Sequence, residues 1–278
     1  MKNILVATDF SKNADKALQH AILLAKAYQS KIYLIHTYLP YWMEPGVYAD
    51  AVMMQEALDE QQKSVSAKFT PSIEVLEEAG IAYETILELN DVTSGIFDAI
   101  EEKQIDLLVI GRTGSGGFLD KLIGSNAAHI TAKANIPVLA IPNQIEEVKI
   151  KQILYATQLE FDETEVLTQV FAMANKLEAN VNLVKVEVAF EPDVQPDQQF
   201  LAEIKSKFAS EKFEIVMVKA GSVTDGILTL AKVQEADLIV LAAHHRNFLS
   251  QIIDPSKSKQ VILRSPLPVL TFQLKGDL

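Results

Sequence analysis

Gly111-Arg-Thr-Gly-Ser-Gly-Gly-Phe-Leu-Asp-Lys-Leu-Ile-Gly-Ser-Asn126 is a glycine-rich segment that follows an apolar run, Leu107–Ile110. Such a run is typical of a buried parallel strand. Glycines let the backbone turn sharply and approach a ligand closely, and the small and capping residues after Gly124 predict the start of a helix. A helix N-terminus behind a glycine loop suits an anion, whereas the alternative interpretation is a flexible surface loop.

The composition indicates a globular protein of two domains. The chain has 278 residues, of which 49% are hydrophobic and 22% charged. Its net charge of −12 argues against a nucleic-acid partner and against docking on an anionic membrane. The absence of cysteine excludes disulfides, a thiolate nucleophile and a cysteine-based zinc site. The N-terminal apolar run is too short for a signal peptide, so we expect a cytoplasmic protein.

The chain repeats itself. Segments of the first half recur in the second as Ile4–Ser11 and Ile153–Glu160, Val92–Ile96 and Val223–Ile227, Asp106–Val109 and Asp237–Val240, and Ile136–Leu139 and Leu267–Leu270. The last three pairs share one offset, 131 residues (92 to 223), which makes coincidence implausible. We therefore predict two tandem domains, residues 1–145 and 146–278, with the boundary in the polar stretch after Pro142.

Strand-like and helix-like segments alternate in each copy. In the first copy the expected strands are Asn3–Ala7, Lys31–Thr37, Tyr83–Glu88, Leu107–Ile110 and Val138–Ile141. A helix is expected over Ser11–Gln29, and its counterpart from Asp162, with Glu165 completing a capping box. The alternation predicts an α/β fold of two doubly wound, five-stranded parallel sheets, flavodoxin-like or Rossmann-like, with strand order 3-2-1-4-5.

Three loops converge where the strand order of such a sheet reverses. The first strand delivers Ala7, Thr8 and Asp9, the second ends at Thr37, and the fourth leads into the loop after Gly111. An acidic side chain, a strand-end backbone and a glycine loop suit the sugar or metal, the base and the phosphates of a nucleotide. Asp9 alone is a weak signal, because aspartate after a strand is often a turn or cap residue.

The spacing Gly111-x2-Gly114-x9-Gly124-Ser125 between a strand and a helix, together with Ile4–Ser11, resembles the universal stress protein family. The resemblance covers both halves, so the chain is similar to a tandem member. In that family the glycine motif marks members that bind ATP. The resemblance also implies that the fifth strands of the two domains pair, Val138–Ile141 with Val269–Phe272, which gives a monomeric pseudo-dimer, with a homodimer as the alternative.

The family pattern implies a role for each matching position. Asp9 would contact adenosine or nucleotide-bound Mg²⁺, and Thr37 would hold adenine through its backbone. The remaining implied nucleotide-binding positions are Ala7 and Thr8 beside Asp9, Gly111, Arg112 and Gly114 near ribose and the α-phosphate, and Gly124, Ser125 and Asn126 at the terminal phosphates. Asn126 departs from the small or β-branched residue usual there. Arg112 has an alternative interpretation as an exposed, solubilising side chain.

The second copy departs much further from the motif. Gln158, Ala242, His245 and Pro255 replace the aspartate and the three spaced glycines, so we predict that the second domain binds no ATP. The histidines outside the motif point to no site: His36 is expected to be a satisfied core residue, and adjacent His244 and His245 point apart. The aromatic and methionine-rich stretch Tyr38–Gln62 is interpreted as core or domain contact, or as a cover over the nucleotide.

The leading hypothesis is an ATP- or AMP-binding regulatory protein of the stress response, with one nucleotide site and an unknown protein partner. Two alternatives stay open: a slow ATPase or phosphotransferase, and an interaction scaffold that binds no nucleotide. A P-loop is absent and Arg112 and Lys121 are the nearby cations, so any hydrolysis is expected to be slow or absent. The stress role depends on resemblance alone.

Overall fold

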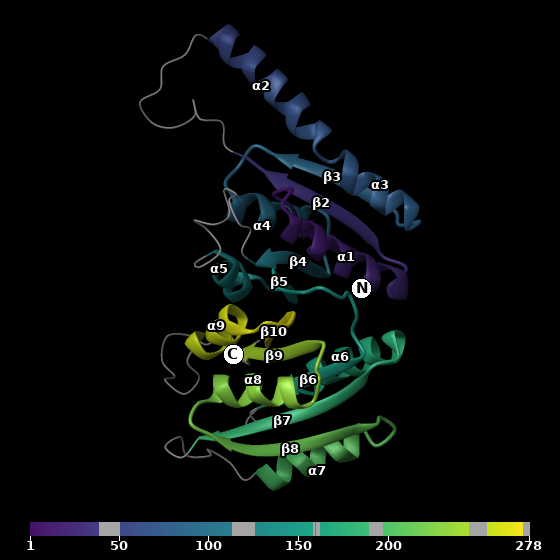
Figure 1. Cartoon of the computed structure of the whole chain (residues 1–278), viewed down its shortest axis with the longest axis vertical. Coiled ribbons are helices and arrows are strands. Elements are labelled where there is room, and N and C mark those ends of the chain that lie inside the picture. The colour runs from purple at the N-terminus through teal and green to yellow at the C-terminus, as the bar shows by residue number, and fades with distance from the viewer. Residues whose placement is uncertain are drawn as a thin grey trace. The chain divides into compact units, whose positions relative to one another are not determined.

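The chain divides into two compact units, Met1–Ile130 and Thr131–Leu278. A computed structural model describes residues 1–38, 51–112, 126–157, 159, 162–188, 197–244 and 255–274 (Figure 1). The last strand of the first repeat, β5 (Val138–Pro142), is grouped with the second unit because it pairs with β10 there. The domain bounds 1–145 and 146–278 stay a prediction.

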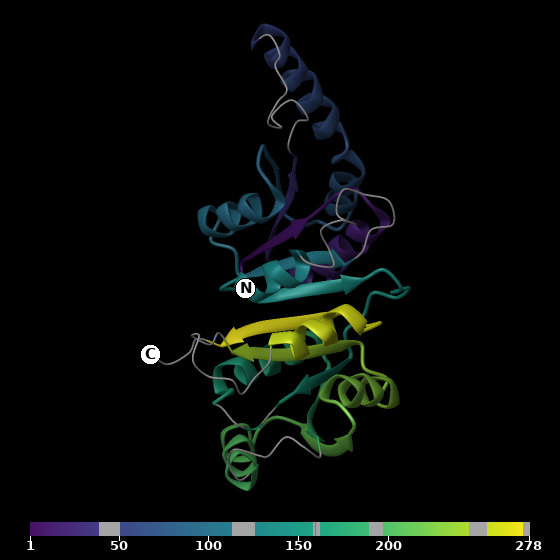
Figure 2. The same ribbon diagram turned by 90° about the vertical axis from the view of Figure 1, so that its left-hand side faces the viewer.

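The first unit is a parallel sheet covered by helices on both faces. Its elements are β1 (Asn3–Ala7), α1 (Lys12–Tyr28), β2 (Lys31–Thr37), α2 (Ala51–Ala67), α3 (Thr70–Glu78), β3 (Tyr83–Glu88), α4 (Val92–Glu102), β4 (Leu107–Arg112) and the start of α5 (Asn126–Lys133). The strands run parallel in the order β3-β2-β1-β4. Helices α1 and α3 lie on one face and α4 on the other (Figure 2). Central β1 is buried completely at Ile4, Leu5 and Val6.

The second unit repeats this arrangement. Its elements are β5, β6 (Gln152–Ala156), α6 (Thr164–Leu177), β7 (Asn180–Val188), α7 (Asp197–Lys207), β8 (Phe213–Ala220), α8 (Val223–Val233), β9 (Leu238–His244), α9 (Pro255–Arg264) and β10 (Val269–Leu274). The strands of the second repeat lie in the order β10-β9-β6-β7-β8 and are parallel. Renumbered within the repeat this is 5-4-1-2-3, so the predicted doubly wound α/β fold is confirmed. The expected pairing of the two fifth strands is present: β5 and β10 are antiparallel, with Leu139 opposite Leu270.

Local sequence signals explain where α1 begins, but not where α6 begins. Ser11 caps α1 by accepting from the N–H of Ala14 at 3.2 Å. The predicted capping box at Asp162 and Glu165 is wrong, because the N-cap of α6 is Glu163, without a side-chain cap bond. Asp162 instead accepts from the N–H of Thr164 two residues later, at 2.9 Å, which is an Asx turn ahead of the helix.

Left-handed backbone conformations recur at matching places in the two repeats. Among the described residues, the non-glycine residues with positive φ are Phe10 and Leu159, Gln29 and Glu178, and Gln104 and Glu235. Each pair has the offset already seen in the sequence of its part of the repeat. The residues that end α1 and α6, Gln29 and Glu178, have φ values of 56° and 52°. The duplication therefore extends to the turns as well as to the strands.

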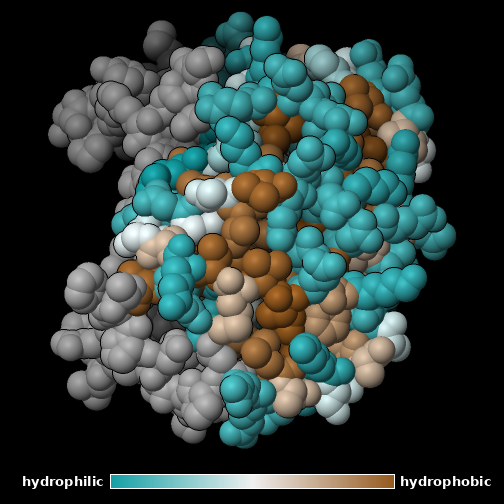
Figure 3. All heavy atoms as spheres, turned by 60° about the horizontal axis from the view of Figure 1, so that its bottom comes forward, coloured by the Kyte–Doolittle hydropathy of each residue, from teal (hydrophilic) through white to brown (hydrophobic). Residues whose placement is uncertain are grey.

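On the face drawn in Figure 3, apolar residues gather in the middle and polar residues surround them. Large apolar side chains exposed by the described residues include Val233, Met217 and Leu263, of which Val233 is exposed most, at 71%. Single apolar residues on a surface are ordinary in soluble proteins and point to no partner. None of the described helices is both long and apolar enough to cross a membrane.

Burial of His20 in α1 predicts an acid-sensitive first unit. His20 is fully buried, its Nδ1 lies 2.8 Å from the carbonyl oxygen of Lys16, and burial lowers its pKa. The unfolded chain takes up a proton at this residue near pH 6.5 while the folded chain resists it, so stability falls as the pH drops from about 7 through the folded pKa.

We expect His20→Gln, which copies Gln169 of the second repeat, to reduce this loss. Urea unfolding midpoints at pH 7.5 and pH 5.5 measure the difference. Burial also lowers the pKa of His36, so the variant is expected to keep part of the pH dependence of stability. An unchanged difference between the two midpoints would show that His20 does not cause the acid sensitivity.

Candidate functional site

Three strand ends of the first unit meet at one edge of its sheet. Ala7, the last residue of β1, pairs with Ile35 of β2 on one side and with Ile110 of β4 on the other. Because the strands are parallel, Asp9 follows β1 at this edge, and Thr37 and Gly111 lie in the last residues of β2 and β4. The three strand ends therefore lie side by side as predicted, while the loops that follow Tyr38 and Arg112 fall outside the described residues.

The loop from β1 to α1 is fixed by hydrogen bonds of its own side chains. Phe10 has a positive φ of 62°, and its N–H donates to the hydroxyl of Thr8 at 3.0 Å. The N–H of Ser11 donates to Oδ1 of Asp9, also at 3.0 Å. Asp9 thus forms a turn with its own side chain, which is the alternative interpretation of this residue. The same hydrogen bond holds its carboxylate in place at the sheet edge.

His36 ties the end of β2 to the end of β1. Its Nδ1 lies 2.8 Å from the carbonyl oxygen of Thr8, which can only accept, so Nδ1 carries the proton and donates. Burial lowers the pKa of His36, and the ring packs on Phe10 with centroids 4.6 Å apart. Phe10 in turn meets Phe69 edge to face at 5.1 Å. His36 is a hydrogen-bonded, partly buried residue, in agreement with its interpretation as a core histidine.

Thr37 lies beyond the last pair of the β1–β2 ladder. The register ends at Ala7 and Ile35, and the N–H of Thr8 adds one more bond to the carbonyl oxygen of Ile35 at 2.9 Å. On the other side, the N–H of Tyr38 donates to the carbonyl oxygen of Glu88 in β3 at 3.0 Å. The backbone of β2 therefore extends past β1 at this edge.

The end of β4 is packed tightly by the first turn of α1. A Cβ on Gly111 would lie 2.8 Å from Nδ2 of Asn13, closer than real Cβ atoms approach other atoms, and 3.1 Å from the backbone oxygen of Asn13, which is also a tight contact. Packing against Asn13 therefore favours glycine at position 111, whether or not a ligand also approaches there. The next residue, Arg112, is 6% exposed, and burial lowers its pKa to about 10. The interpretation of Arg112 as an exposed solubilising residue is wrong.

The rest of the glycine loop falls outside the described residues. This applies to Gly114, Gly124 and Ser125, and also to most of the aromatic stretch, residues 39–50. Asn126 is the first residue of α5, as a helix start after the loop requires. In the described ranges, no three metal-ligating side chains come together as a metal site.

A glycine that sequence reasoning used only as a repeat marker has a structural role at this edge. A Cβ on Gly95 of α4 would lie 2.7 Å from Cγ2 of Thr37. Its counterpart Gly226 of α8 would bring a Cβ within 2.5 Å of Val186. The repeated Val-Thr-x-Gly-Ile pattern was the available signal: it keeps a helix close to the strand ends in both repeats.

The second unit has a buried polar group at positions where the first has two apolar residues and a histidine. The hydroxyl of Tyr155 donates to Oε2 of Glu163 at 2.9 Å, and both residues are buried, as is Lys185 of β7. Burial and the nearby Glu163 carboxylate raise the pKa of Tyr155 well above its usual range, so the phenol is neutral. At the matching positions of the first repeat stand Val6, Ala14 and His36. This group was missed in the sequence analysis. A signal was available, because Tyr155, Glu163 and Lys185 replace a valine, an alanine and a histidine of the first repeat.

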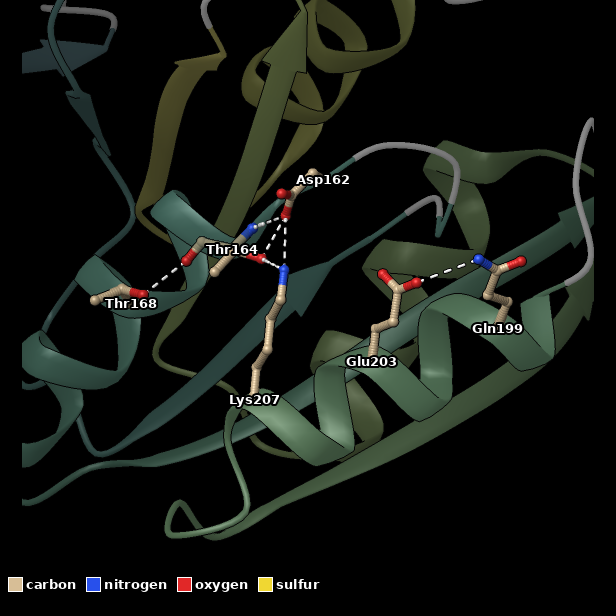
Figure 4. A network of polar contacts seen from close by, with 6 residues as sticks. All are labelled: Asp162, Thr164, Thr168, Gln199, Glu203 and Lys207. Carbon is tan, nitrogen blue, oxygen red and sulfur yellow. Dashed lines mark hydrogen bonds and ion pairs between the residues drawn. The ribbon is translucent and has the colours of Figure 1, made fainter.

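A second polar cluster joins α6 to α7 on the surface (Figure 4). Lys207 Nζ donates to Oγ1 of Thr164 at 2.8 Å and lies 3.7 Å from Oδ1 of Asp162, while Thr164 donates to the same carboxylate. Because these side chains are exposed, the cluster contributes little to stability. Its position ahead of α6 corresponds to the loop that carries Asp9 in the first unit.

Comparison with known proteins identifies both halves. The Universal stress protein family (Usp) matches residues 1–142 and again residues 149–273. Universal stress protein MJ0531 of Methanocaldococcus jannaschii is 29% identical over 147 residues, covering 52% of this chain and 85% of that protein. Universal stress protein Slr1230 of Synechocystis is 22% identical over 307 residues, covering 98% of this chain and 100% of that protein.

A solved structure supports the fold over the full length. The crystal structure of a universal stress protein from Archaeoglobus fulgidus has a TM-score of 0.75 at 18% identity and covers 98% of both chains. At this identity the likeness concerns the fold alone. The two matches to the family model show that this chain belongs to the universal stress protein family and carries two of its domains in tandem.

Proposed function

We propose that the first unit binds one adenine nucleotide, ATP or AMP, at the sheet edge where β1, β2 and β4 end. The observation that supports this most is the convergence of Asp9, Thr37 and Gly111 beside the N-terminus of α1. Ligands of doubly wound sheets bind at the carboxyl ends of the strands, where the order reverses. In this unit the order reverses between β1 and β4.

Each element of the edge has a chemical task in the proposal. The extended backbone at Thr37 pairs with the edge of the base, and the carboxylate of Asp9 accepts from the sugar or holds nucleotide-bound Mg²⁺. The helix N-terminus and the buried guanidinium of Arg112 favour negative charge nearby, which suits phosphates. The glycine loop, through Gly114, Gly124, Ser125 and Asn126, completes the phosphate site in this proposal.

We predict that the second unit binds no nucleotide. Ala242 stands where the first repeat has Gly111, and Lys185 stands where it has His36. The buried hydrogen bond of Tyr155 to Glu163 puts polar side chains beneath the corresponding edge. The protein is thus proposed to be an asymmetric, nucleotide-dependent regulator with one site, and its cytoplasmic location, protein partner and monomeric state stay predictions.

The proposal predicts a single bound nucleotide per chain after purification. Acid release followed by mass spectrometry identifies it, and calorimetric titration with ATP, AMP and Mg²⁺ measures the affinity of the stripped protein. Asp9→Ala is expected to weaken binding about 10- to 100-fold, the effect of losing a hydrogen bond to a charged group. Gln158→Ala, at the equivalent position of the second repeat, is the matched control and should bind normally.

Two results would contradict the proposal. If the purified chain carries no nucleotide and shows no heat of binding with ATP and Mg²⁺, the scaffold hypothesis replaces it. If steady turnover of ATP accompanies binding and disappears in Asp9→Ala, the chain is an ATPase rather than a regulator.

A further inference from the structure

Asn13 is a buried polar residue at the proposed site to which the family pattern gives no role. It is the second residue of α1 and is 5% exposed. Its amide nitrogen lies against Gly111, 2.8 Å from the place where a Cβ would be. Asn13 therefore lies on the β4 side of β1, between the first turn of α1 and the end of β4.

The amide oxygen of Asn13 lacks a donor. Oδ1 is buried and has no hydrogen-bond partner among the described residues. Buried polar atoms in folded proteins are nearly always paired, because an unpaired one loses its bonds to water without compensation. A buried acceptor of this kind beside a proposed ligand site indicates that the ligand supplies the donor.

Because an amide oxygen is an acceptor, only a donor group of the nucleotide can form a hydrogen bond with it. It accepts and cannot donate, and nucleotide phosphates near neutral pH offer acceptors almost exclusively. The adenine amino group is a donor, but the base is proposed to lie at Thr37, on the β2 side of β1, whereas Asn13 lies on the β4 side. The hydroxyls of the sugar are the donors that remain.

We infer that Oδ1 of Asn13 accepts a hydrogen bond from a ribose hydroxyl of the bound nucleotide and so makes the site selective for ribose. This rests on the proposed function, because it assigns one contact within the same site. Gly111 completes the arrangement: without a side chain, it lets the amide lie directly on the backbone of β4.

The second repeat does not have this arrangement. Asp162 occupies the position of Asn13 but is exposed, and its carboxylate binds Thr164 and Lys207 (Figure 4). Ala242 replaces Gly111, so the bare backbone is missing as well. Asp162→Ala is accordingly a matched control that changes the equivalent residue outside the proposed site.

The test compares ATP with 2′-deoxy-ATP and 3′-deoxy-ATP by calorimetric titration. The unmodified chain should bind one of the deoxy analogues about 3- to 10-fold more weakly than ATP, as expected for one neutral hydrogen bond. Asn13→Ala should bind ATP and that analogue equally, and should lose the same factor for ATP, ADP and AMP. Asp162→Ala should keep the full discrimination of the unmodified chain.

Several outcomes would overturn the inference. Equal affinity of the unmodified chain for ATP and both deoxy analogues would do so without any variant, even if Asn13→Ala failed to fold. Undiminished discrimination by a folded Asn13→Ala would show that water satisfies Oδ1. A loss that grows with the number of phosphates would assign the amide to a phosphate instead. If the unmodified chain binds no adenine nucleotide, the proposed function fails and the inference with it, a result distinct from binding without discrimination.

Discussion

Replacing Tyr155 with alanine is expected to destabilise the second unit by about 3–5 kcal/mol, the usual cost of removing a buried aromatic ring. Tyr155 is completely buried in β6, between β7 and β9, and its hydroxyl donates to the buried carboxylate of Glu163. The alanine variant loses the packing of the ring and leaves Glu163 without this donor. Both losses act in the same direction.

Tyr155→Phe separates the two contributions. It keeps the ring and removes the hydroxyl, so the expected loss is about 1–3 kcal/mol, the cost of an unmade hydrogen bond at a buried acceptor. Hydrogen exchange read by mass spectrometry should show faster exchange in β6 and β7 and unchanged exchange in the first unit. Unfolding of Tyr155→Phe at the same urea concentration as the unmodified chain would show that the hydroxyl contributes nothing.

Gly111→Ala is expected to destabilise the first unit by about 1–3 kcal/mol, as overpacking of a filled site does. The added Cβ would lie 2.8 Å from Nδ2 of Asn13 and 3.1 Å from its backbone oxygen. A side chain can rotate away, but the backbone of α1 cannot move without disturbing its contacts with the sheet. Faster hydrogen exchange in the first turns of α1 is the direct measurement.

The second repeat provides the control for this prediction. It has Ala242 at the same position, and α6 begins at Thr164, two residues after the counterpart of Asn13. Ala242→Gly should therefore relieve no clash and should cost about 0.5–1 kcal/mol, the usual penalty of glycine inside a strand. Equal and opposite effects of Gly111→Ala and Ala242→Gly would contradict this account of the packing.

The sequence was sufficient to predict the fold because its signals are local. Apolar runs such as Lys31–Thr37 marked the strands, with bounds that the structure confirms for β1, β2 and β3. The alternation of strands and helices then predicted a doubly wound parallel sheet, and the repeat predicted two such domains. Helix starts were harder, as the incorrect capping box at Asp162 shows, because an aspartate can cap a helix or form a turn ahead of it.

The site was less predictable, since its contacts join residues far apart in the chain. Nothing near Arg112 in the sequence signals that its side chain is buried. The packing of Asn13 on Gly111 and the hydrogen bond of Tyr155 to Glu163 likewise depend on how a helix meets a strand. Such burial and contacts are determined by tertiary packing, and the residue pattern of a single segment does not predict how that segment packs against others.

The paired left-handed turns have a consequence for how a tandem protein of this kind can change. A non-glycine residue in that conformation costs roughly 1–2 kcal/mol, yet Phe10 and Leu159 both adopt it, although the motif around Leu159 has been replaced. The left-handed turn is therefore retained together with the strands and helices of the fold, even where the residues around it differ between the two repeats. Either half can exchange its strand-end side chains, and with them its specificity, while the architecture of the other half is left as it was.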